Sequence, residues 1–241
     1  MIFKFFSPKQ GLEDLLHLFY PQICAACSRP LLQHEKGLCS RCKRQLPRTD
    51  FHLWKGNPAE RLFYGRLDLA AITSAFFFIQ GGGVQQLLHR IKYQGKAEIA
   101  QQLGQRWGQL IKNVSAFSAC QGIVPVPLHP KKLKKRGFNQ SKAIALGLSE
   151  ALGRPVLDST LQRVQNSQTQ TKLNPLERWK NVENAFVLNK GSQVLGKHIL
   201  LVDDVLTTGA TIEAAAKTLL LGKAKSVSVF TLAMAHKFDV S

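Results

Sequence analysis

The segment ILLVDDVLTTGATI, residues 199–212, constrains the fold of this chain more than any other feature of its sequence. Four aliphatic residues lead directly into two carboxylates, Asp203 and Asp204, and a bend rich in threonine and glycine then opens a helix-like stretch. A continuous apolar run is typical of a central strand in a parallel sheet, because both faces of such a strand are covered. Ligands of parallel sheets collect beyond the carboxyl ends of the strands, so we expect the two acids to face a ligand.

The bend after the acids is suited to binding an anion. Gly209 permits a tight turn, backbone N–H groups can converge on one point, and the N-terminus of the next helix adds partial positive charge. The predicted anion-binding residues are Val205, Leu206, Thr207, Thr208, Gly209, Ala210 and Thr211. Because Asp203 and Asp204 would repel the same anion, they must meet sugar hydroxyls, a divalent metal or both. A sugar phosphate satisfies both halves of the segment.

Other classes of protein also place acids after an apolar strand. A nucleoside triphosphatase needs the loop G-x-x-x-x-G-K-[ST], which this sequence lacks, and GGGVQQLL at residues 81–88 does not replace it. A phospho-acceptor aspartate would not need the threonine-rich bend. A strand and turn with incidental acids is the remaining alternative.

Strands alternate with helices along the rest of the chain. Hydrophobic patterning predicts strands at residues 71–79, 122–127, 198–204 and 226–234, and helices at 84–93, 97–114, 140–152 and 211–221. This alternation predicts an α/β fold with a parallel sheet covered on both faces. An irregular stretch rich in glycine and proline, residues 51–65, predicts a linker between an N-terminal segment, residues 1–50, and a main domain, residues 66–241.

Charge and hydropathy restrict the partners and the location. Lysine and arginine number 33 against 15 acids, a net charge of +18, so we expect the surface to attract phosphate-bearing partners. A generic basic surface that keeps the protein soluble is the alternative. No apolar run approaches the about 20 residues of a membrane span, and the first residues make a poor signal peptide. We therefore expect a cytoplasmic protein with no membrane insertion, in which thiols stay reduced.

Four of the five cysteines form two C-x-x-C pairs in the segment CAACSRPLLQHEKGLCSRC, namely Cys24, Cys27, Cys39 and Cys42. In a reducing compartment this spacing predicts a tetrahedral zinc site, because each tight turn aims two thiolates at one ion. With sulfur at every position the ion would hold structure and leave no place for a catalytic water. A redox dithiol is the alternative, and His17 and His34 are alternative ligands. Cys120 lies apart and is expected to be an inert thiol near the core.

A dense basic run follows the strand predicted at 122–127. It consists of Lys131, Lys132, Lys134, Lys135 and Arg136. We expect these residues in a loop, where their charges repel one another unless an anion such as a nucleic-acid backbone comes close, and a solvated basic face is the alternative. Phe138 could stack on a base or anchor the next helix, and Asn139 could cap that helix. Lys92, in RIKYQGK, could extend the same face or be an ordinary lysine at a helix end.

Together these motifs resemble a known family. ILLVDDVLTTGAT is similar to the phosphoribosyl-pyrophosphate motif of type I phosphoribosyltransferases, in which the acids bind the ribose hydroxyls and the bend binds the 5′-phosphate. With the four cysteines, RIKYQGK, VPVPLHPKKLKKRGFNQS and LERWKNVENAF, the chain resembles the ComF/GntX competence family over nearly its whole length. The resemblance implies a type I phosphoribosyltransferase-like domain with a small N-terminal zinc-binding segment.

The resemblance also implies roles for individual residues. Asp203 and Asp204 would orient the ribose, with Mg²⁺ accompanying phosphoribosyl pyrophosphate, and Leu128, His129 and Lys131 would lie in the loop that holds pyrophosphate. Residues 157–190 would include the hood, a flexible strand pair that closes over the substrate. Relatives often have Arg-x-Arg and then threonine there. Here Arg163 is present, Gln165 and Ser167 replace the second arginine and the threonine, and Gln170, Arg178 and Asn181 match.

Two functions follow from this resemblance. The first is a protein of natural competence that binds phosphoribosyl pyrophosphate and single-stranded DNA, together with DNA-uptake and recombination proteins. The nucleic-acid contacts would come from the zinc segment and from a basic face made of Lys132, Lys134, Lys135, Arg136, Phe138 and Lys92. The alternative is an active phosphoribosyltransferase, which transfers the pentose to an unidentified base or amine.

Overall fold

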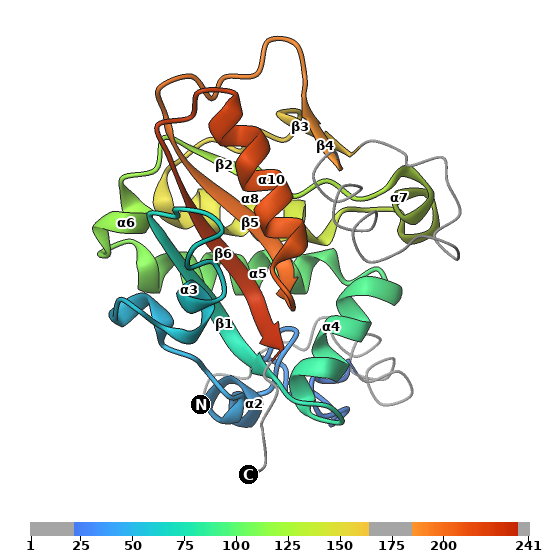
Figure 1. Cartoon of the computed structure of the whole chain (residues 1–241). Coiled ribbons are helices and arrows are strands. Elements are labelled where there is room, and N and C mark those ends of the chain that lie inside the picture. The colour runs from blue at the N-terminus through green and yellow to red at the C-terminus, as the bar shows by residue number, and fades with distance from the viewer. Residues whose placement is uncertain (1–21, 164–184, 236–241) are drawn as a thin grey trace, which may run out of the picture.

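A four-stranded parallel sheet forms the centre of the molecule (Figure 1). The computed structural model describes residues 22–163 and 185–235. The order of the strands is β1-β6-β5-β2. Their bounds are β1 Ala71–Phe78, β2 Gly122–Pro125, β5 His198–Leu206 and β6 Ser226–Ala235. The predicted parallel α/β sheet is confirmed, and β5 lies between two partners, as its continuous apolar run indicates.

Helices cover both faces of this sheet. Residues of β5 alternate between two hydrophobic clusters, with Leu200 and Val202 in one and Ile199 and Leu201 in the other. The first cluster also contains residues of α4 Gly83–Tyr93, α5 Ala97–Ile111 and α8 Gln140–Leu152, whereas the second contains residues of α10 Ala210–Leu221. The alternation of β5 side chains thus fixes one helical layer on each face.

The pair α5 and α8 packs unusually closely. A Cβ atom on Gly104 would overlap the carbonyl oxygen of Ile144, and a Cβ atom on Gly147 would overlap that of Gln101. The two helices therefore touch along their backbones, and only glycine fits at these two crossing points. This contact fixes the position of α8, whose first residues lie at the carboxyl edge of the sheet.

The N-terminal cysteine segment packs against α4 and α5. Buried residues of this segment, among them Cys24, Ala26 and Leu38, belong to the same hydrophobic cluster as the two helices. Arg90 of α4 fixes the segment further, because Nη1 donates to the Cys24 carbonyl at 2.7 Å and Nη2 donates to Ser28 Oγ at 2.8 Å. A short helix, α2 Ser40–Gln45, completes the segment.

The stretch predicted as a linker is folded against β1. It contains the 3-10 helix η1 Phe51–Leu53 and helix α3 Pro58–Arg61, and Phe51, Asn57 and Phe63 are buried. The Asn57 amide donates to the carbonyl of Ile72 at 3.1 Å. The division of the chain into two parts at 51–65 stays a prediction.

The basic run forms a helix, so the prediction of a loop was wrong. Helix α7 Pro130–Arg136 begins with proline, His129 Nδ1 accepts from the Lys131 N–H at 3.2 Å, and Gly137 ends the helix with φ of 77°. Proline in the first turn and a left-handed glycine after the last turn are strong helix boundaries, and they outweigh the mutual repulsion of the basic side chains. A further short helix, α6 Ser115–Ser118, precedes β2.

A second, two-stranded sheet pairs β3 Leu161–Arg163 with β4 Phe186–Leu188 in antiparallel order. These strands flank the region where the family resemblance places the hood. Of the hood residues, Arg163 ends β3, and its guanidinium lies 5.4 Å from the Phe186 ring centre. The other predicted hood residues, Gln165, Ser167, Gln170, Arg178 and Asn181, lie outside the described residues.

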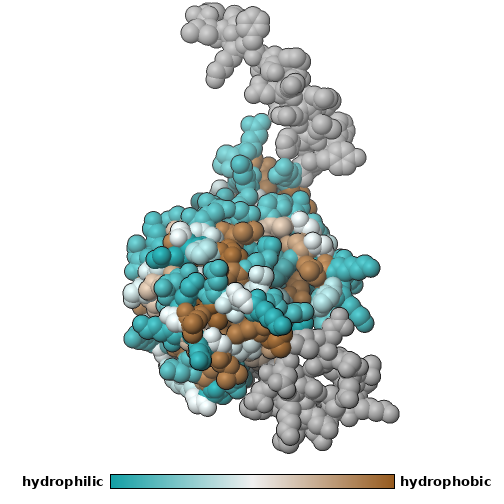
Figure 2. All heavy atoms as spheres, turned by 90° about the horizontal axis from the view of Figure 1, so that it is seen from above, coloured by the Kyte–Doolittle hydropathy of each residue, from teal (hydrophilic) through white to brown (hydrophobic). Residues whose placement is uncertain are grey.

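Apolar and hydrophilic residues are interspersed on the face seen in Figure 2. This view looks down on the molecule from the side where Figure 1 shows β3 and β4. Mixed surface of this kind is usual for folded proteins, since more than half of their accessible surface is apolar. In the two described ranges, no helix is both long enough and apolar enough to cross a membrane.

Candidate functional site

The two adjacent acids lie near the carboxyl end of β5, where the sequence places them. Asp203 is half-buried and Asp204 is 8% exposed. The strand continues two residues beyond its predicted end, so Val205 and Leu206 pair with β6 and do not belong to the bend. Leu206 is buried in the core, which leaves Thr207 as the first exposed residue after the strand.

Three other residues surround the acids. Lys92 Nζ lies 2.8 Å from Asp204 Oδ2, and Gln140 Nε2 donates to the same oxygen at 2.9 Å. Asp203 Oδ1 accepts from Ser141 Oγ at 3.0 Å. The site therefore draws on the end of α4, the start of α8 and the end of β5. One ammonium group and two neutral donors face two carboxylates, so the cluster carries more negative than positive charge.

The start of α8 is held in place by Asn139. Its Oδ1 accepts from the Ser141 N–H at 3.0 Å, and its Nδ2 donates to the Val126 carbonyl at 3.0 Å. The predicted capping role is therefore confirmed, and the same side chain also ties α8 to the chain just after β2. Phe138 is half-buried and packs against the hydrophobic core, which is the anchoring alternative for this residue.

The bend after β5 is open to solvent at its two threonines and supported from behind. Thr207 and Thr208 are exposed, whereas Gly209 is buried and has φ of 82°. A Cβ atom on Gly209 would meet the ring of Phe63 at 2.8 Å. Arg66 Nη1 donates to the Thr208 carbonyl at 3.3 Å, and Arg66 also forms an ion pair with Glu213 of α10. Glycine is required here by both conformation and space.

The first turn of α10 lies directly behind the bend. Gly209 is its N-cap, and the helix runs for 12 residues. Its first backbone N–H groups have no acceptor within the helix, so they and the Thr208 and Thr211 hydroxyls can donate to an anion. Of these groups, the Ala210 N–H donates to Thr208 Oγ1 at 3.5 Å. The bend and the acids thus offer donors and acceptors at neighbouring places on one strand–helix connection.

The residues assigned to pyrophosphate and nucleic acid lie on and around α7. Leu128 and His129 are half-buried, and Lys131, Lys132, Lys134 and Lys135 are exposed. Arg136 packs over the Tyr93 ring at 5.3 Å, which joins α7 to the end of α4. Lys92 is engaged by Asp204, so its charge belongs to the carboxylate cluster in this structure.

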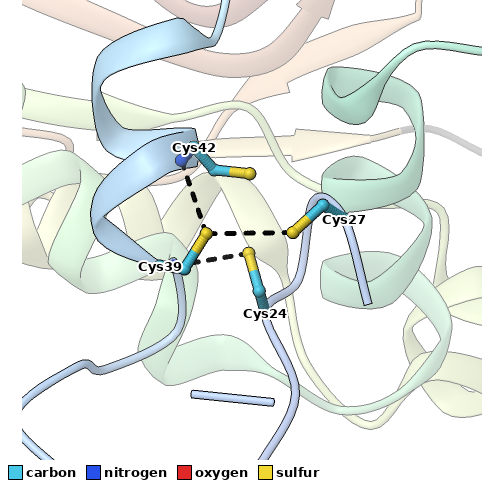
Figure 3. A group of neighbouring side chains, drawn as sticks. All are labelled: Cys24, Cys27, Cys39 and Cys42. Atoms are coloured by element: carbon cyan, nitrogen blue, oxygen red, sulfur yellow. Dashed lines mark hydrogen bonds between the residues drawn. The ribbon is translucent and has the colours of Figure 1, made fainter. Parts of the chain in front are cut away.

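The four N-terminal cysteines converge on one point (Figure 3). Their Sγ atoms all lie within 4.8 Å of one another, and the sulfurs of Cys27 and Cys39 are 3.8 Å apart. Sulfurs bound tetrahedrally at about 2.3 Å from zinc are about 3.8 Å apart, so the cluster has the right size for one ion. The Cys39 N–H donates to Cys24 Sγ at 3.3 Å, and the Cys42 N–H donates to Cys39 Sγ at 3.4 Å. These four residues could hold a metal such as zinc.

Of the two predicted alternative ligands, only His34 lies within the described residues. His34 is exposed and is not part of the four-sulfur group, and His17 lies outside the described residues. Cys120 is completely buried away from the cluster. Burial raises the pKa of its thiol to about 11, in keeping with the inert thiol that the sequence predicts.

Known proteins identify the family of this chain. Residues 133–237 match the phosphoribosyl transferase domain family. The DNA utilization protein YhgH of Escherichia coli is 30% identical over 236 residues, which cover 89% of this chain and 98% of that protein. The competence protein ComFC of Bacillus subtilis is 30% identical over 87% of this chain and 77% of its own. The chain belongs to the ComF/GntX family. Competence protein F of Haemophilus influenzae is 27% identical over 91% and 93% of the two chains.

Two residues of the carboxylate cluster in this ComF/GntX protein were not predicted as site residues from the sequence. Gln140 and Ser141 are the first residues of α8 and read as ordinary helix-start residues. The signal that could have found them is topological. They follow β2, the neighbour of β5, and polar residues at the start of a helix after an adjacent strand come to the same edge of a parallel sheet.

The electrostatics of the cluster are unfavourable to a second charge. Burial and the neighbouring Asp204 carboxylate raise the pKa of Asp203 to about 7, although Ser141 and Lys92 act in the opposite direction. An unfolded aspartate has a pKa of about 3.9. The folded protein therefore binds this proton more tightly than the unfolded chain does. The stability that this difference contributes is full at low pH and is lost as the pH rises through 7.

The raised pKa of Asp203 leads to a prediction about how stability depends on pH. Asp203→Asn keeps the shape of the side chain and carries no charge at any pH, so the gain in Tm over the wild type should grow as the pH rises from 5.5 to 8. We expect a gain of about 1 kcal/mol or more at pH 8, which is about 2–4 °C in Tm for a chain of this size. Thermal melts at several pH values measure it. The control is Asp158→Asn at an exposed acid, and a gain at Asp203 that stayed constant with pH would contradict the buried-charge account.

Proposed function

We propose that this ComF/GntX protein binds phosphoribosyl pyrophosphate together with Mg²⁺ at the end of β5. The proposal rests on the connection between β5 and α10. There, half-buried Asp203 is followed by an exposed bend in which Gly209 has a left-handed conformation. The carboxylates would accept from the ribose hydroxyls, and the bend would donate to the 5′-phosphate. Each half of the connection then meets the part of the ligand with complementary polarity.

The remaining parts of the ligand have partners nearby in the chain. His129 and Lys131, at the start of α7, would contact the pyrophosphate, and Lys131 is exposed and able to reach an anion. Carboxylate and phosphate oxygens are the ligands that Mg²⁺ prefers, and the donor set at this edge fits such an ion. The ion would neutralise pyrophosphate charge.

Calorimetry tests this site. With Mg²⁺ present, wild-type protein should bind phosphoribosyl pyrophosphate, and Asp203→Ala combined with Asp204→Ala should abolish the heat of binding. The matched control is Asp68→Ala combined with Asp158→Ala, because both acids are exposed and neither is a hydrogen-bond or ion-pair partner of Lys92, Gln140 or Ser141. Unchanged binding in the Asp203 and Asp204 variant would refute the proposal. Release of pyrophosphate in the presence of nucleobases or amines would favour the alternative, an active phosphoribosyltransferase.

We propose further that the protein acts on single-stranded DNA in natural competence, with DNA-uptake and recombination proteins as partners. The basic side chains of α7 support this part. Lys132, Lys134 and Lys135 are exposed, and no acidic group within residues 22–163 and 185–235 forms an ion pair with them. Relatives with competence and DNA utilization in their names agree with this function.

The salt dependence of DNA binding tests the role of α7. Each phosphate neutralised on a single strand contributes about 0.7 to the slope of log K against log salt. Replacing Lys132, Lys134 and Lys135 with glutamine should therefore reduce the slope by about 2. Fluorescence anisotropy with a labelled oligothymidine measures it. The control removes the same charge elsewhere, at Lys190, Lys223 and Lys225, and equal losses in both variants would argue against a specific role for α7.

We propose that the four cysteines hold one structural zinc ion. Elemental analysis should find about one equivalent of zinc, and Cys42→Ser should lose the metal and lower Tm, because three thiolates bind zinc less tightly than four. Cys120→Ala removes a thiol outside the cluster and should keep the metal. A folded wild-type protein without metal would overturn the proposal.

A further inference from the structure

A groove lies between the cysteine segment and α5, apart from the carboxylate cluster and from α7. Its volume is about 270 Å³. One wall consists of the loop before α2 and of Lys43 on α2, and the other wall is α5. Buried Leu38 and Leu103 line its apolar part. Figure 1 shows α2 and α7 at different sides of the molecule. We call this feature the α2–α5 groove.

The charged lining of the α2–α5 groove is entirely basic. His34, Lys36, Lys43 and Arg106 line it, and none of its lining residues is acidic. Within the two described ranges, Lys36, Lys43 and Arg106 form no ion pair with an acidic side chain. Arg106 Nη2 donates to the Lys43 carbonyl at 3.4 Å, so its guanidinium reaches across from α5 to α2. Basic groups gathered in this way without counterions attract an anion.

Glu35, which lies between the lining residues His34 and Lys36 in the chain, binds the protein backbone. Glu35 accepts from the Leu32 N–H at 3.1 Å and from the Ser40 N–H at 2.5 Å. The N–H and hydroxyl of Ser40 and the N–H of Leu32 lower the pKa of Glu35 to about 2. The carboxylate therefore holds the loop together and stays ionised at neutral pH. Its oxygens bind two loop donors, and it forms no ion pair with the described side chains of Lys36, Lys43 and Arg106.

A much smaller hollow, of about 10 Å³, adjoins the α2–α5 groove along α5. It shares Lys43, Leu103 and Arg106 with the first and adds Arg48 and Leu110. Arg48 lies 5.0 Å from the ring centre of Trp107, and its Nη2 forms an ion pair with Asp50 Oδ1 at 3.3 Å. The two hollows span α5 from Ile99 to Leu110, about 16 Å at a rise of 1.5 Å per residue. Among the described residues, the cations without an ion pair are therefore those of the larger hollow, and the paired Arg48 lies beyond them.

We propose that the α2–α5 groove binds the sugar-phosphate backbone of single-stranded nucleic acid, as a second surface besides α7. The proposal rests on the single-strand binding proposed above and assigns it a site. Unpaired cations gathered around one groove can hold the phosphates of a strand, and the apolar surface beside them can accept a sugar or a base. The metal-binding segment then has a role beyond folding, because it supplies one wall of the groove.

The test replaces Lys36, Lys43 and Arg106 with glutamine in the full chain. Anisotropy with labelled oligothymidine should show a salt slope lower by about 2 and an affinity lower by about tenfold or more. The comparison variants are the α7 triple variant and the control at Lys190, Lys223 and Lys225. Lys43→Arg with Arg106→Lys keeps the charge and should keep the wild-type slope. Zinc content and Tm establish that each variant is folded.

The outcomes separate the two proposals. If the groove variant keeps the wild-type slope while the α7 variant loses it, the groove inference is wrong and single-strand binding stands. If the wild type binds no strand, the proposed function fails and the groove inference with it. A titration with thymidine monophosphate and with inorganic phosphate completes the test. Binding of these small anions at the groove without any effect of the groove variant on strand binding would make it a small-molecule site and overturn the inference.

Discussion

The structure depends on a balance of charge at the end of β5. Two carboxylates lie side by side where burial penalises their charge, and three groups from outside the strand offset that penalty: Lys92, Gln140 and Ser141. Each comes from a helix whose position is set elsewhere. Lys92 ends α4, which also holds the cysteine segment through Arg90, and the other two begin α8. The site can be acidic inside a strongly basic protein because these helices bring compensating donors to the same edge.

The position of α8 shows how packing serves the site. Glycines at the crossing of α5 and α8 let the two backbones touch, and Asn139 ties the start of α8 to the chain after β2. A small shift of α8 would separate Gln140 from Asp204, because a hydrogen bond weakens steeply beyond its normal length. The glycines lie far along the helices from the carboxylates, yet they decide where the donors stand. The packing of the core therefore sets the geometry of the candidate site.

Much of the fold could be predicted from the sequence, because patterns of neighbouring residues determine it. The apolar run before Asp203, the helical spacing in α5 and the two C-x-x-C pairs each depend on residues close together in the chain. The predictions failed where distant residues or cap chemistry decided the outcome. The loop expected at 131–136 is a helix because Pro130 and Gly137 bound it. The contact of Lys92 with Asp204 joins residues more than a hundred positions apart, and no periodicity reports such a contact.

The bend depends on residues that lie outside the segment matching the phosphoribosyl transferase domain. Arg66 and Phe63 support Thr208 and Gly209 from behind, and Lys92 neutralises Asp204, yet all three supporting residues precede the segment that matches the phosphoribosyl transferase domain, residues 133–237. A fragment cut at the limits of that match would keep the acids and the threonines while losing their scaffolding and their counter-charge. The N-terminal half therefore supplies part of the proposed site, and transplanting the matched segment alone would carry over the motif without the residues that support it.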